Sequence, residues 1–326
     1  EAAAQCGYAE GLGCSNTDYN NFGFGSNNSA ATIEYDNYSG AFHGSVVREY
    51  NGNFRIWGQS SNASGEDHLS PVVINKANYP GLANDEFVLK ATLGSNQQNS
   101  EQTFVLTNLN RIWYWGNGTN TPVVTNDNNS SPYSGTNMRS MDLPTNVTAA
   151  MVKVFYAVPR SIAIVTCDGL VYVRSQQADM RGVGGNGSVN GWNKVQKTGG
   201  VDLTNVIALR GTDQGFFALS QDGSGNQSLW TWGPRTYDGS SAADDRNLAT
   251  TVSNPAGANN IKMIAVSGRT SSGNAITYFV LGKDGKLYSM GDGANNILGN
   301  WGTSNSTSWV RPKYPNAGGT AAGADM

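Results

Sequence analysis

A repeat with a period of 58 residues constrains the fold of this chain more strongly than any other feature of its sequence. Five short segments, the first of them "NGNFRIWG", each place a large residue directly before a small one. Aligned on that large residue, they give one anchor position per repeat: Trp57, Trp115, Arg174, Trp232 and Met290. Successive anchors are 58 or 59 residues apart. A fixed period of this length indicates one supersecondary unit that is stacked several times.

Each repeat is predicted to contain four strands. An apolar residue stands three positions before every anchor, as a strand with a fixed depth in a core requires: Phe54, Ile112, Val171, Leu229 and Leu287. Three of these strands follow the hairpin signal of a two-residue type I′ turn: Asn51-Gly52, Asp168-Gly169 and Asp284-Gly285. Two further apolar runs precede each turn, and a weaker run follows each anchor. We therefore expect four-stranded antiparallel blades near residues 30–80, 84–126, 150–198, 204–254 and 260–315.

The fold predicted from these blades is an all-β propeller. No segment shows sustained helical periodicity, and four strands per unit favour a propeller over a solenoid. Five repeats are visible, and the pattern leaves room for further blades. The repeats occupy residues 28–326, and residues 1–27 are predicted to form an N-terminal segment that acts as a clasp or a partial blade.

The repeat resembles that of the regulator of chromosome condensation family. The resemblance rests on Gly40, His43 and Ser45 in "SGAFHGSVV", on the Trp-Gly pairs at three anchors, and on "DGKLYSMGDGANNILGN" in the last repeat. It covers residues 30–316, and repeat three departs from it with Arg174-Ser175 in place of Trp-Gly. The resemblance implies a propeller, in most members of seven blades, that acts mainly through contacts with other proteins.

Charge and hydropathy exclude two classes of partner. The formal net charge is -3, and no run of Lys and Arg forms a basic patch, so nucleic acid is not a predicted partner. The role that gives the family its name, nucleotide exchange on a small GTPase at chromatin, calls for a basic nucleosome-binding segment that this sequence lacks. No stretch of 18 apolar residues occurs, so no membrane span is predicted.

No cofactor, no metal site and no enzymatic activity are predicted. Gly182, Gly184 and Gly187 match the G-x-G-x-x-G spacing of a dinucleotide-binding turn, but the residues after them do not predict the helix that would hold a phosphate. His43 and His68 lack the converging ligands of a metal site and the oriented partner of a catalytic dyad.

The N-terminus and the cysteines are compatible with export. The start "EAAAQCGYAEG" is either a mature end left by removal of a signal peptide or a boundary within a longer chain. Cys6 and Cys14 are close enough in sequence for a small disulfide loop, and Cys167, in an apolar strand, is predicted to be a buried thiol. We therefore expect an extracellular or cell-surface location.

The expected function is binding without catalysis. Low charge with abundant Asn, Gly, Ser and Thr is typical of bacterial adhesins and assembled surface filaments. We expect a secreted or cell-surface module for adhesion or filament formation that contacts a protein or glycan or assembles with itself. Two alternatives stay open: a secreted inhibitor that caps another protein's active site, and a polysaccharide-active enzyme that uses a propeller face.

The predicted contact residues are aromatic side chains in the connectors after the anchor strands. They are Trp192 in "NGWNKV", Tyr237 in "RTYDGS" and Trp301 in "GNWGTS". Such connectors carry function because a rigid scaffold presents them, and aromatic side chains dominate interface hot spots and stack on sugar rings. The same three residues would also suit a buried role at a blade edge, and the sequence does not decide between the two.

Overall fold

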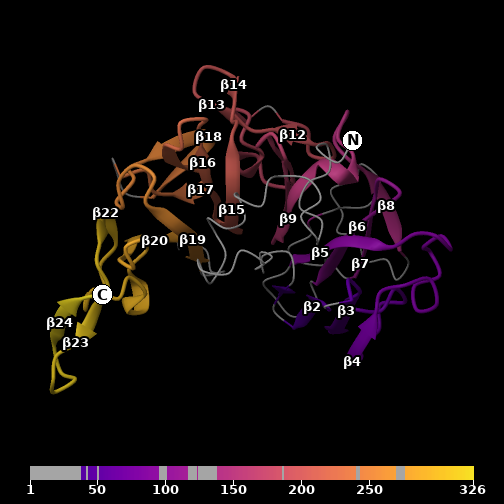
Figure 1. Cartoon of the computed structure of the whole chain (residues 1–326), viewed down its shortest axis with the longest axis horizontal. Coiled ribbons are helices and arrows are strands. Elements are labelled where there is room, and N and C mark those ends of the chain that lie inside the picture. The colour runs from indigo at the N-terminus through magenta and orange to yellow at the C-terminus, as the bar shows by residue number, and fades with distance from the viewer. Residues whose placement is uncertain are drawn as a thin grey trace. The chain divides into compact units, whose positions relative to one another are not determined.

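The computed structural model describes residues 38–41, 43–49, 51–94, 101–116, 123, 138–185, 187–239, 243–268 and 276–326. In these residues almost all regular structure is β-strand, arranged in five sheets and one separate hairpin (Figure 1). Helical structure in the same residues is limited to short 3-10 turns, namely η3 (Ala149–Met151), η4 (Asp179–Arg181) and η5 (Ala294–Asn296). The predicted four-stranded antiparallel blades are confirmed.

The first three sheets each contain four strands whose order in the sheet follows the chain. The strands of blade one are β1 (Tyr38–Gly40), β2 (Gly44–Arg48), β3 (Phe54–Gly58) and β4 (His68–Val73). Those of blade two are β5 (Val88–Gly94), β6 (Gln102–Thr107), β7 (Arg111–Gly116) and β8 (Arg139–Asp142). Those of blade three are β9 (Val152–Val158), β10 (Ser161–Thr166), β11 (Val171–Ser175) and β12 (Asn193–Lys194).

Blades four and five continue the pattern, each with a short hairpin nearby. The strands of blade four are β15 (Val206–Thr212), β16 (Gly215–Gln221), β17 (Gln227–Thr236) and β18 (Asp244–Val252), and those of blade five are β19 (Ile261–Gly268), β20 (Ile276–Gly282), β21 (Leu287–Gly291) and β22 (Ser306–Val310). The hairpin of β13 (Gln196–Lys197) and β14 (Val201–Asp202) joins blade four, because β13 pairs with β18 in parallel. The strands β23 (Lys313–Pro315) and β24 (Ala322–Asp325) form the separate hairpin.

The chain divides into two compact units. The first contains the described residues up to Gln177 together with Ser188–Asn193, and the second contains Ala178–Gly187 together with Lys194–Met326. Blades one and two lie in the first unit, and blades four and five lie in the second. The predicted N-terminal segment, residues 1–27, is outside the described residues.

Trp115 and Trp232 occupy equivalent places in β7 and β17, as the repeat period predicts. Both side chains are fully buried. The indole Nε1 of Trp115 donates to the backbone oxygen of Ser61 at 2.9 Å, and that of Trp232 donates to the backbone oxygen of Met180 at 3.0 Å. Ser61 and Met180 each lie in the connector after the preceding anchor strand. Each tryptophan therefore ties its own blade to the connector before it, which explains why the anchor recurs.

Steric contacts explain why a glycine follows the anchor residue. Gly58 and Gly116 both adopt a φ of 103°, a left-handed conformation that favours glycine. A Cβ atom would stand 2.1 Å from the backbone oxygen of His43 at the first position and 2.3 Å from that of Glu101 at the second. The Trp-Gly pair thus combines a side chain that fills the core with a backbone that approaches the neighbouring strand.

The hairpins between the second and third strands differ from the predicted type I′ turns. In the turns that end at Gly52, Gly169 and Gly285, the glycine has a positive φ and the Asn or Asp before it does not, and the glycine N–H donates to the carbonyl oxygen three residues earlier. This is the three-residue loop in which a type I turn is followed by a left-handed glycine. The side chain of the Asn or Asp before each glycine accepts a hydrogen bond from the N–H two residues ahead, which also stabilises the turn.

Blade two extends further than the predicted range of residues 84–126. Its fourth strand, expected at residues 121–125, is β8 (Arg139–Asp142), which pairs with β7. The segment "TPVVT" was predicted to be this strand because it has the composition of a strand, and composition alone does not decide which segment pairs with β7. In the structure its Val123 is instead a buried core residue whose N–H donates to Gln102 Oε1 at 2.7 Å.

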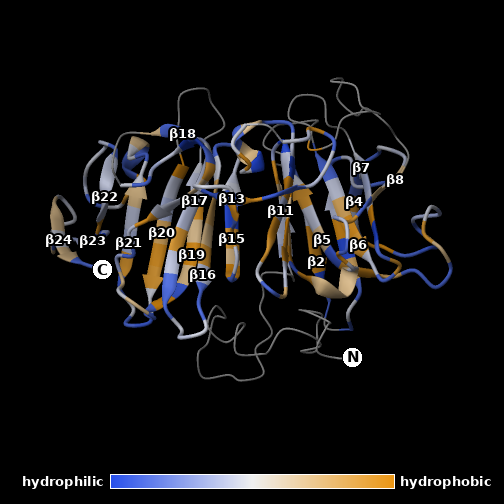
Figure 2. Cartoon of the chain, turned by 90° about the horizontal axis from the view of Figure 1, so that it is seen from above, coloured by the Kyte–Doolittle hydropathy of each residue, from blue (hydrophilic) through white to orange (hydrophobic). Residues whose placement is uncertain are grey.

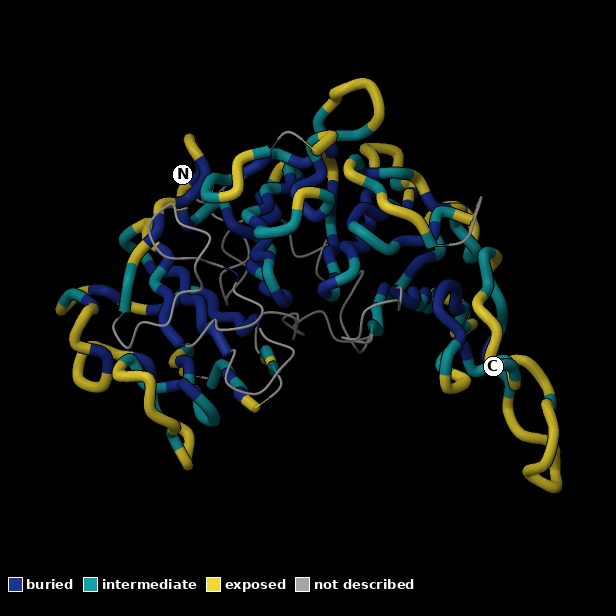
Figure 3. The backbone as a smooth tube through the Cα atoms, turned by 180° about the vertical axis from the view of Figure 1, so that it is seen from behind, coloured by how far each residue is buried: buried dark blue, intermediate teal, exposed yellow. Residues whose placement is uncertain are grey.

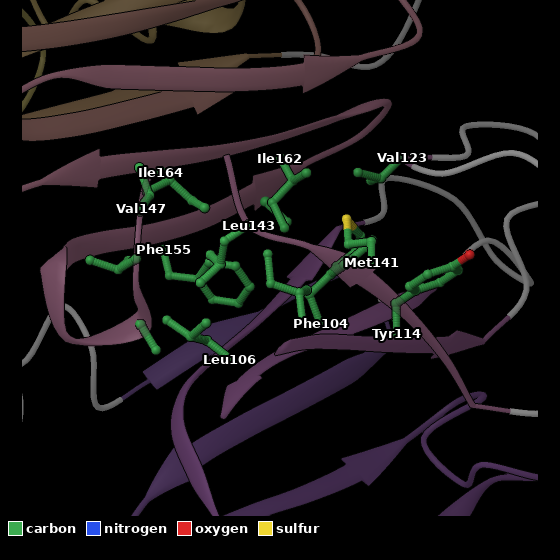
Figure 4. Packing of buried hydrophobic residues seen from close by; sticks show 14 residues of the cluster. Phe104, Leu106, Tyr114, Val123, Met141, Leu143, Val147, Phe155, Ile162 and Ile164 are labelled. Atoms are coloured by element: carbon green, nitrogen blue, oxygen red, sulfur yellow. The ribbon is translucent and has the colours of Figure 1, made fainter. Parts of the chain in front are cut away.

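The core lies between neighbouring blades within each unit. In the first unit, Phe104 of β6 and Phe155 of β9 point toward one another with Leu143 between the sheets (Figure 4). In the second unit, Phe217 of β16 and Tyr278 of β20 lie with ring centroids 4.5 Å apart. Figure 2 shows hydrophobic residues concentrated in the strands and hydrophilic residues in the connecting loops. Stacking of blade faces therefore supplies the hydrophobic burial that a single blade lacks.

Candidate functional site

The connector between β21 and β22 presents Trp301 to solvent. Its side chain is 45% exposed, and its backbone adopts a φ of 67°. A positive φ is a genuine outlier for a large L-residue and costs about 1–2 kcal/mol. Neighbouring residues hold it in place, because Gly302 N–H donates to Asn300 Oδ1 at 3.1 Å. Trp301 is thus an exposed aromatic side chain on a strained backbone.

The rest of this connector is firmly attached to the blade. Leu298 is fully buried, and its carbonyl oxygen accepts a hydrogen bond from Ser289 Oγ at 2.6 Å. Gly299 lies two residues before Trp301, and its carbonyl oxygen accepts from Lys313 N–H at 2.9 Å. On the other side, Gly293 N–H donates to Asn305 Oδ1 at 3.0 Å. The connector therefore holds Trp301 in a fixed position on the blade.

Tyr237 is a supporting residue, and its side chain lacks the exposure on which its predicted role as a partner contact depends. Its side chain is 1% exposed, and a hydrogen bond joins it to Asn305. Its N–H donates to the hydroxyl of buried Tyr278 at 3.1 Å. Burial and the nearby Asp292 raise the pKa of Tyr237. The turn-like sequence around Tyr237 suggested exposure, but the ring fills a space beneath the connector that carries Trp301.

Trp192 lies in the first unit and is half-buried. Its Nε1 donates to the backbone oxygen of Asp142 at 2.8 Å, and its ring packs against the buried cluster of blades two and three. The side chain therefore secures the connector before β12, and a contact with a partner through its exposed part stays a prediction. Trp301 and Tyr237 belong to the second unit.

Cys167 is disulfide-bonded, so the expectation of a buried free thiol is wrong. The residue lies just after β10 in a partly buried position, where its N–H donates to Met151 O at 2.9 Å. Cys6 and Cys14 lie outside the described residues. Because the chain has three cysteines, a disulfide at Cys167 and the expected Cys6–Cys14 pair exclude each other within one chain.

Peptide mapping without reduction is expected to recover the Cys167 peptide linked to a peptide that contains Cys6 or Cys14. A disulfide in a secreted protein typically contributes about 2–5 kcal/mol to stability, so Cys167→Ser is expected to lower the melting temperature measurably. The matched control is Ser140→Ala, a similarly small change at an exposed position of β8. Recovery of Cys167 as an alkylated free thiol from protein that was never reduced would contradict the assignment.

The remaining chemical motifs do not form a reactive centre in the described residues. Gly182 ends η4, and no helix follows Gly184 and Gly187 before β12. His43 Nδ1 lies 3.1 Å from Gln59 Oε1, and His68 Nδ1 lies 3.1 Å from Ser61 Oγ. Burial lowers the pKa of His68. The described residues contain no group of three or more His, Cys, Asp or Glu that could hold a metal ion.

Glu86 is a buried carboxylate, and its hydrogen-bond partners account for its burial without a catalytic role. Its Oε1 accepts from Thr107 Oγ1 at 2.6 Å and from Trp113 Nε1 at 2.8 Å, and its Oε2 accepts from Ala83 N–H at 3.0 Å. Burial alone would raise the pKa of Glu86, but these hydrogen bonds and the charge of Arg111 outweigh it and lower the pKa. The ionised carboxylate therefore stabilises blade two.

Replacing Glu86 by glutamine is expected to cost about 1–3 kcal/mol of stability at pH 7. The pKa of Glu86 in the folded protein lies below the ordinary pKa of a glutamate. The stabilisation by the ionised carboxylate is therefore fully present above the ordinary pKa and is lost as the pH falls through the folded pKa. Urea midpoints of wild type and variant should differ at pH 7, and the difference should shrink as the pH falls below the ordinary pKa of a glutamate. Glu66→Gln, at an exposed position, is the control that should show no difference at any of these pH values. A pH-independent loss for Glu86→Gln would contradict the assigned charge state.

Comparison with known proteins supports the fold. No protein-family model and no curated protein matches the sequence. Human WBSCR16 is similar in structure, with 16% identity, a TM-score of 0.52, and coverage of 86% of this chain and 81% of that one. A structure of Kap60 bound to yeast RCC1 (Prp20) matches with 14% identity and a TM-score of 0.52 over 87% of this chain and 61% of that chain. The chain is a β-propeller. At these identities the likeness concerns the fold alone, and in that respect the resemblance to the regulator of chromosome condensation family is confirmed.

The local sequence around Trp301 agrees with the exposure of its side chain. Trp301 stands between Asn300 and Gly302, and both neighbours are typical turn residues. A large residue between two turn residues indicates a tight turn that presents the side chain. The supporting role of Asn305 had no local signal, because Tyr237 lies 68 positions away in the sequence.

Among the described residues, no helix is long and apolar enough to cross a membrane.

Proposed function

We propose that this chain is a non-enzymatic extracellular binding module that contacts a protein or glycan of a cell surface through Trp301. The observation that carries the proposal is the left-handed backbone of an exposed tryptophan. Such strain persists only where the surrounding structure imposes it, and it concentrates at binding sites. A rigid aromatic side chain with a polar N–H is also the commonest kind of interface anchor.

Two further observations support the proposal. The disulfide of Cys167 favours an oxidising compartment, as expected outside the cell. The complex of Kap60 with yeast RCC1 (Prp20) contains a propeller protein that binds another protein, and this analogy rests on the fold. The fixed connector around Trp301 lowers the entropic cost of binding, because little of it has to be ordered on contact.

The proposal is tested with the fluorescently labelled protein on intact epithelial and bacterial cells. We expect saturable binding that is abolished either by protease treatment of the cells, which indicates a protein partner, or by periodate, which indicates a glycan. The same preparations are assayed for release of new reducing ends from a panel of polysaccharides. Turnover of a polysaccharide without saturable binding to any cell would favour the enzymatic alternative and contradict the proposal.

A further inference from the structure

A groove on blade four is lined by residues outside the connector that carries Trp301. It has a volume of about 390 Å³ and forms where the hairpin of β13 and β14 lies beside the outer strand β18. The tip of this hairpin is exposed, as the tube coloured by burial shows (Figure 3). We refer to it below as the hairpin groove.

Trp230 contributes the aromatic surface of the hairpin groove. It precedes the anchor Trp232 by two residues and is paired across the sheet with Thr251 of β18. Its Nε1 donates to Ser220 Oγ at 2.9 Å, which fixes the orientation of the ring. The side chain is only half-buried, so part of the indole is available to a ligand.

Lys197 of β13 lies over this indole, with Nζ 5.5 Å from the ring centroid. In the described part of the chain, Lys197 forms no ion pair, whereas Lys194 on the same segment pairs with Asp202 at 3.0 Å. A cation over an aromatic ring in a concave site, without an acidic side chain beside it, leaves room for an anionic group of a ligand. The flexible stem of Lys197 allows its ammonium group to move aside when a ligand covers the ring.

The other groups that line the hairpin groove are three hydroxyls and two small apolar side chains, Val201 and Ala249. Thr250 and Thr251 come from β18, and Thr198 comes from the turn of the hairpin. Val201 of β14 is 58% exposed and forms an apolar part of the lining. Hydroxyl groups can both donate and accept hydrogen bonds, as the hydroxyls of a sugar do.

We propose that the hairpin groove binds an acidic saccharide, with a uronate as the unit that is recognised. The apolar face of the sugar ring packs on Trp230, its carboxylate pairs with Lys197, and its hydroxyls hydrogen-bond to Thr251 and the neighbouring threonines. Charge complementarity favours the acid over a neutral sugar, because Lys197 forms no ion pair with any of the described carboxylates. An acidic peptide could satisfy Lys197, but it would leave the aromatic face and the hydroxyls without matching groups.

Blade five supplies a comparison for this arrangement. Its equivalent aromatic residue is Tyr288, and Arg311 lies 5.2 Å from the ring centroid. The Nε of Arg311 donates to Leu287 O at 2.9 Å, so the cation already has a protein acceptor. A cation over an aromatic ring is therefore not by itself the proposed site.

The test measures binding by calorimetry at low salt. The probes are an oligogalacturonate, an oligomannuronate, a hyaluronan oligosaccharide, the methyl ester of the oligogalacturonate and a glutamate oligopeptide. We expect at least one acidic oligosaccharide to bind, and the uncharged ester to bind roughly tenfold more weakly when the galacturonate is that ligand. Lys197→Gln should reduce affinity for the acid roughly tenfold and leave affinity for the ester unchanged.

Three variants test whether the saccharide binds in the hairpin groove. Thr251→Val is nearly isosteric and should weaken binding of both the acidic oligosaccharide and its methyl ester, while the melting temperature stays the same. Lys262→Gln makes the same change of charge on blade five and should have no effect. Trp301→Ala should leave saccharide binding intact, so failure at the hairpin groove is distinguishable from failure of the proposed cell-surface contact. The proposal is overturned if none of the acidic oligosaccharides binds, if Lys197→Gln binds them like wild type, or if the peptide binds in their place.

Discussion

Replacing Trp115 or Trp232 by alanine is expected to lower the free energy of unfolding by about 3–5 kcal/mol. Each change removes a fully buried indole and leaves a cavity at the place where a blade meets the preceding connector. Each also deprives a backbone carbonyl, that of Ser61 or Met180, of its N–H donor. The carbonyl of Ser61 keeps a second donor, the hydroxyl of Tyr79 at 2.8 Å, so the cost of the lost hydrogen bond is expected to be larger at Met180.

The measurement is the urea concentration at the midpoint of unfolding of each variant, with unfolding monitored by circular dichroism. Trp57→Ala is the matched control, because Trp57 occupies the same repeat position but is only partly buried. Its expected loss is smaller than that of either buried anchor. Equal losses at all three positions would show that the buried tryptophans have no special role in joining blades to connectors.

Replacing Trp301 by glycine is expected to abolish binding to the cell surface while leaving stability nearly unchanged. Removal of a hot-spot aromatic side chain typically costs about 2 kcal/mol or more of binding energy, which is about a 30-fold loss of affinity. Relief of a left-handed backbone gains about 1–2 kcal/mol, and the greater freedom of glycine in the unfolded chain takes back about 0.5–1 kcal/mol. The net change in the free energy of unfolding is therefore about 0–1.5 kcal/mol.

Binding isotherms on intact cells and thermal unfolding of the same preparations measure the two effects. Tyr38→Ala is the control, since Tyr38 is 59% exposed but lies on β1 in the other unit. It should bind like wild type. A large fall in the melting temperature of Trp301→Gly would show that the side chain is part of the core, which its exposure does not suggest.

The repeat positions could be predicted from the sequence because burial depends on them directly. An apolar residue three positions before the anchor, such as Phe54 or Ile112, is buried in blades one to four and partly buried in blade five, so the period of the sequence and the period of the structure coincide. The four-stranded blades and the role of Trp115 and Trp232 follow from the same pattern. The turn type did not follow, because the difference between a two-residue and a three-residue loop depends on hydrogen bonds and not on composition.

The candidate site was predicted only in part, because exposure depends on contacts between residues far apart in the sequence. Tyr237 and Trp301 stand in similar polar connectors, yet one is buried and the other is 45% exposed. The difference arises from Asn305 and Tyr278, which hold Tyr237 within the second unit. The disulfide of Cys167 likewise joins residues that no local spacing identifies.

Side-chain footprinting tests most directly whether Trp301 contacts the partner. The protein is oxidised by hydroxyl radicals when free and when bound to saturation on intact cells, and oxidation of each aromatic residue is quantified by mass spectrometry. We expect Trp301 to be protected severalfold in the bound state, and exposed Tyr38 to be oxidised equally in both states. Equal oxidation of Trp301 in the free and bound protein would contradict the claim that this strained, exposed tryptophan is the point of contact.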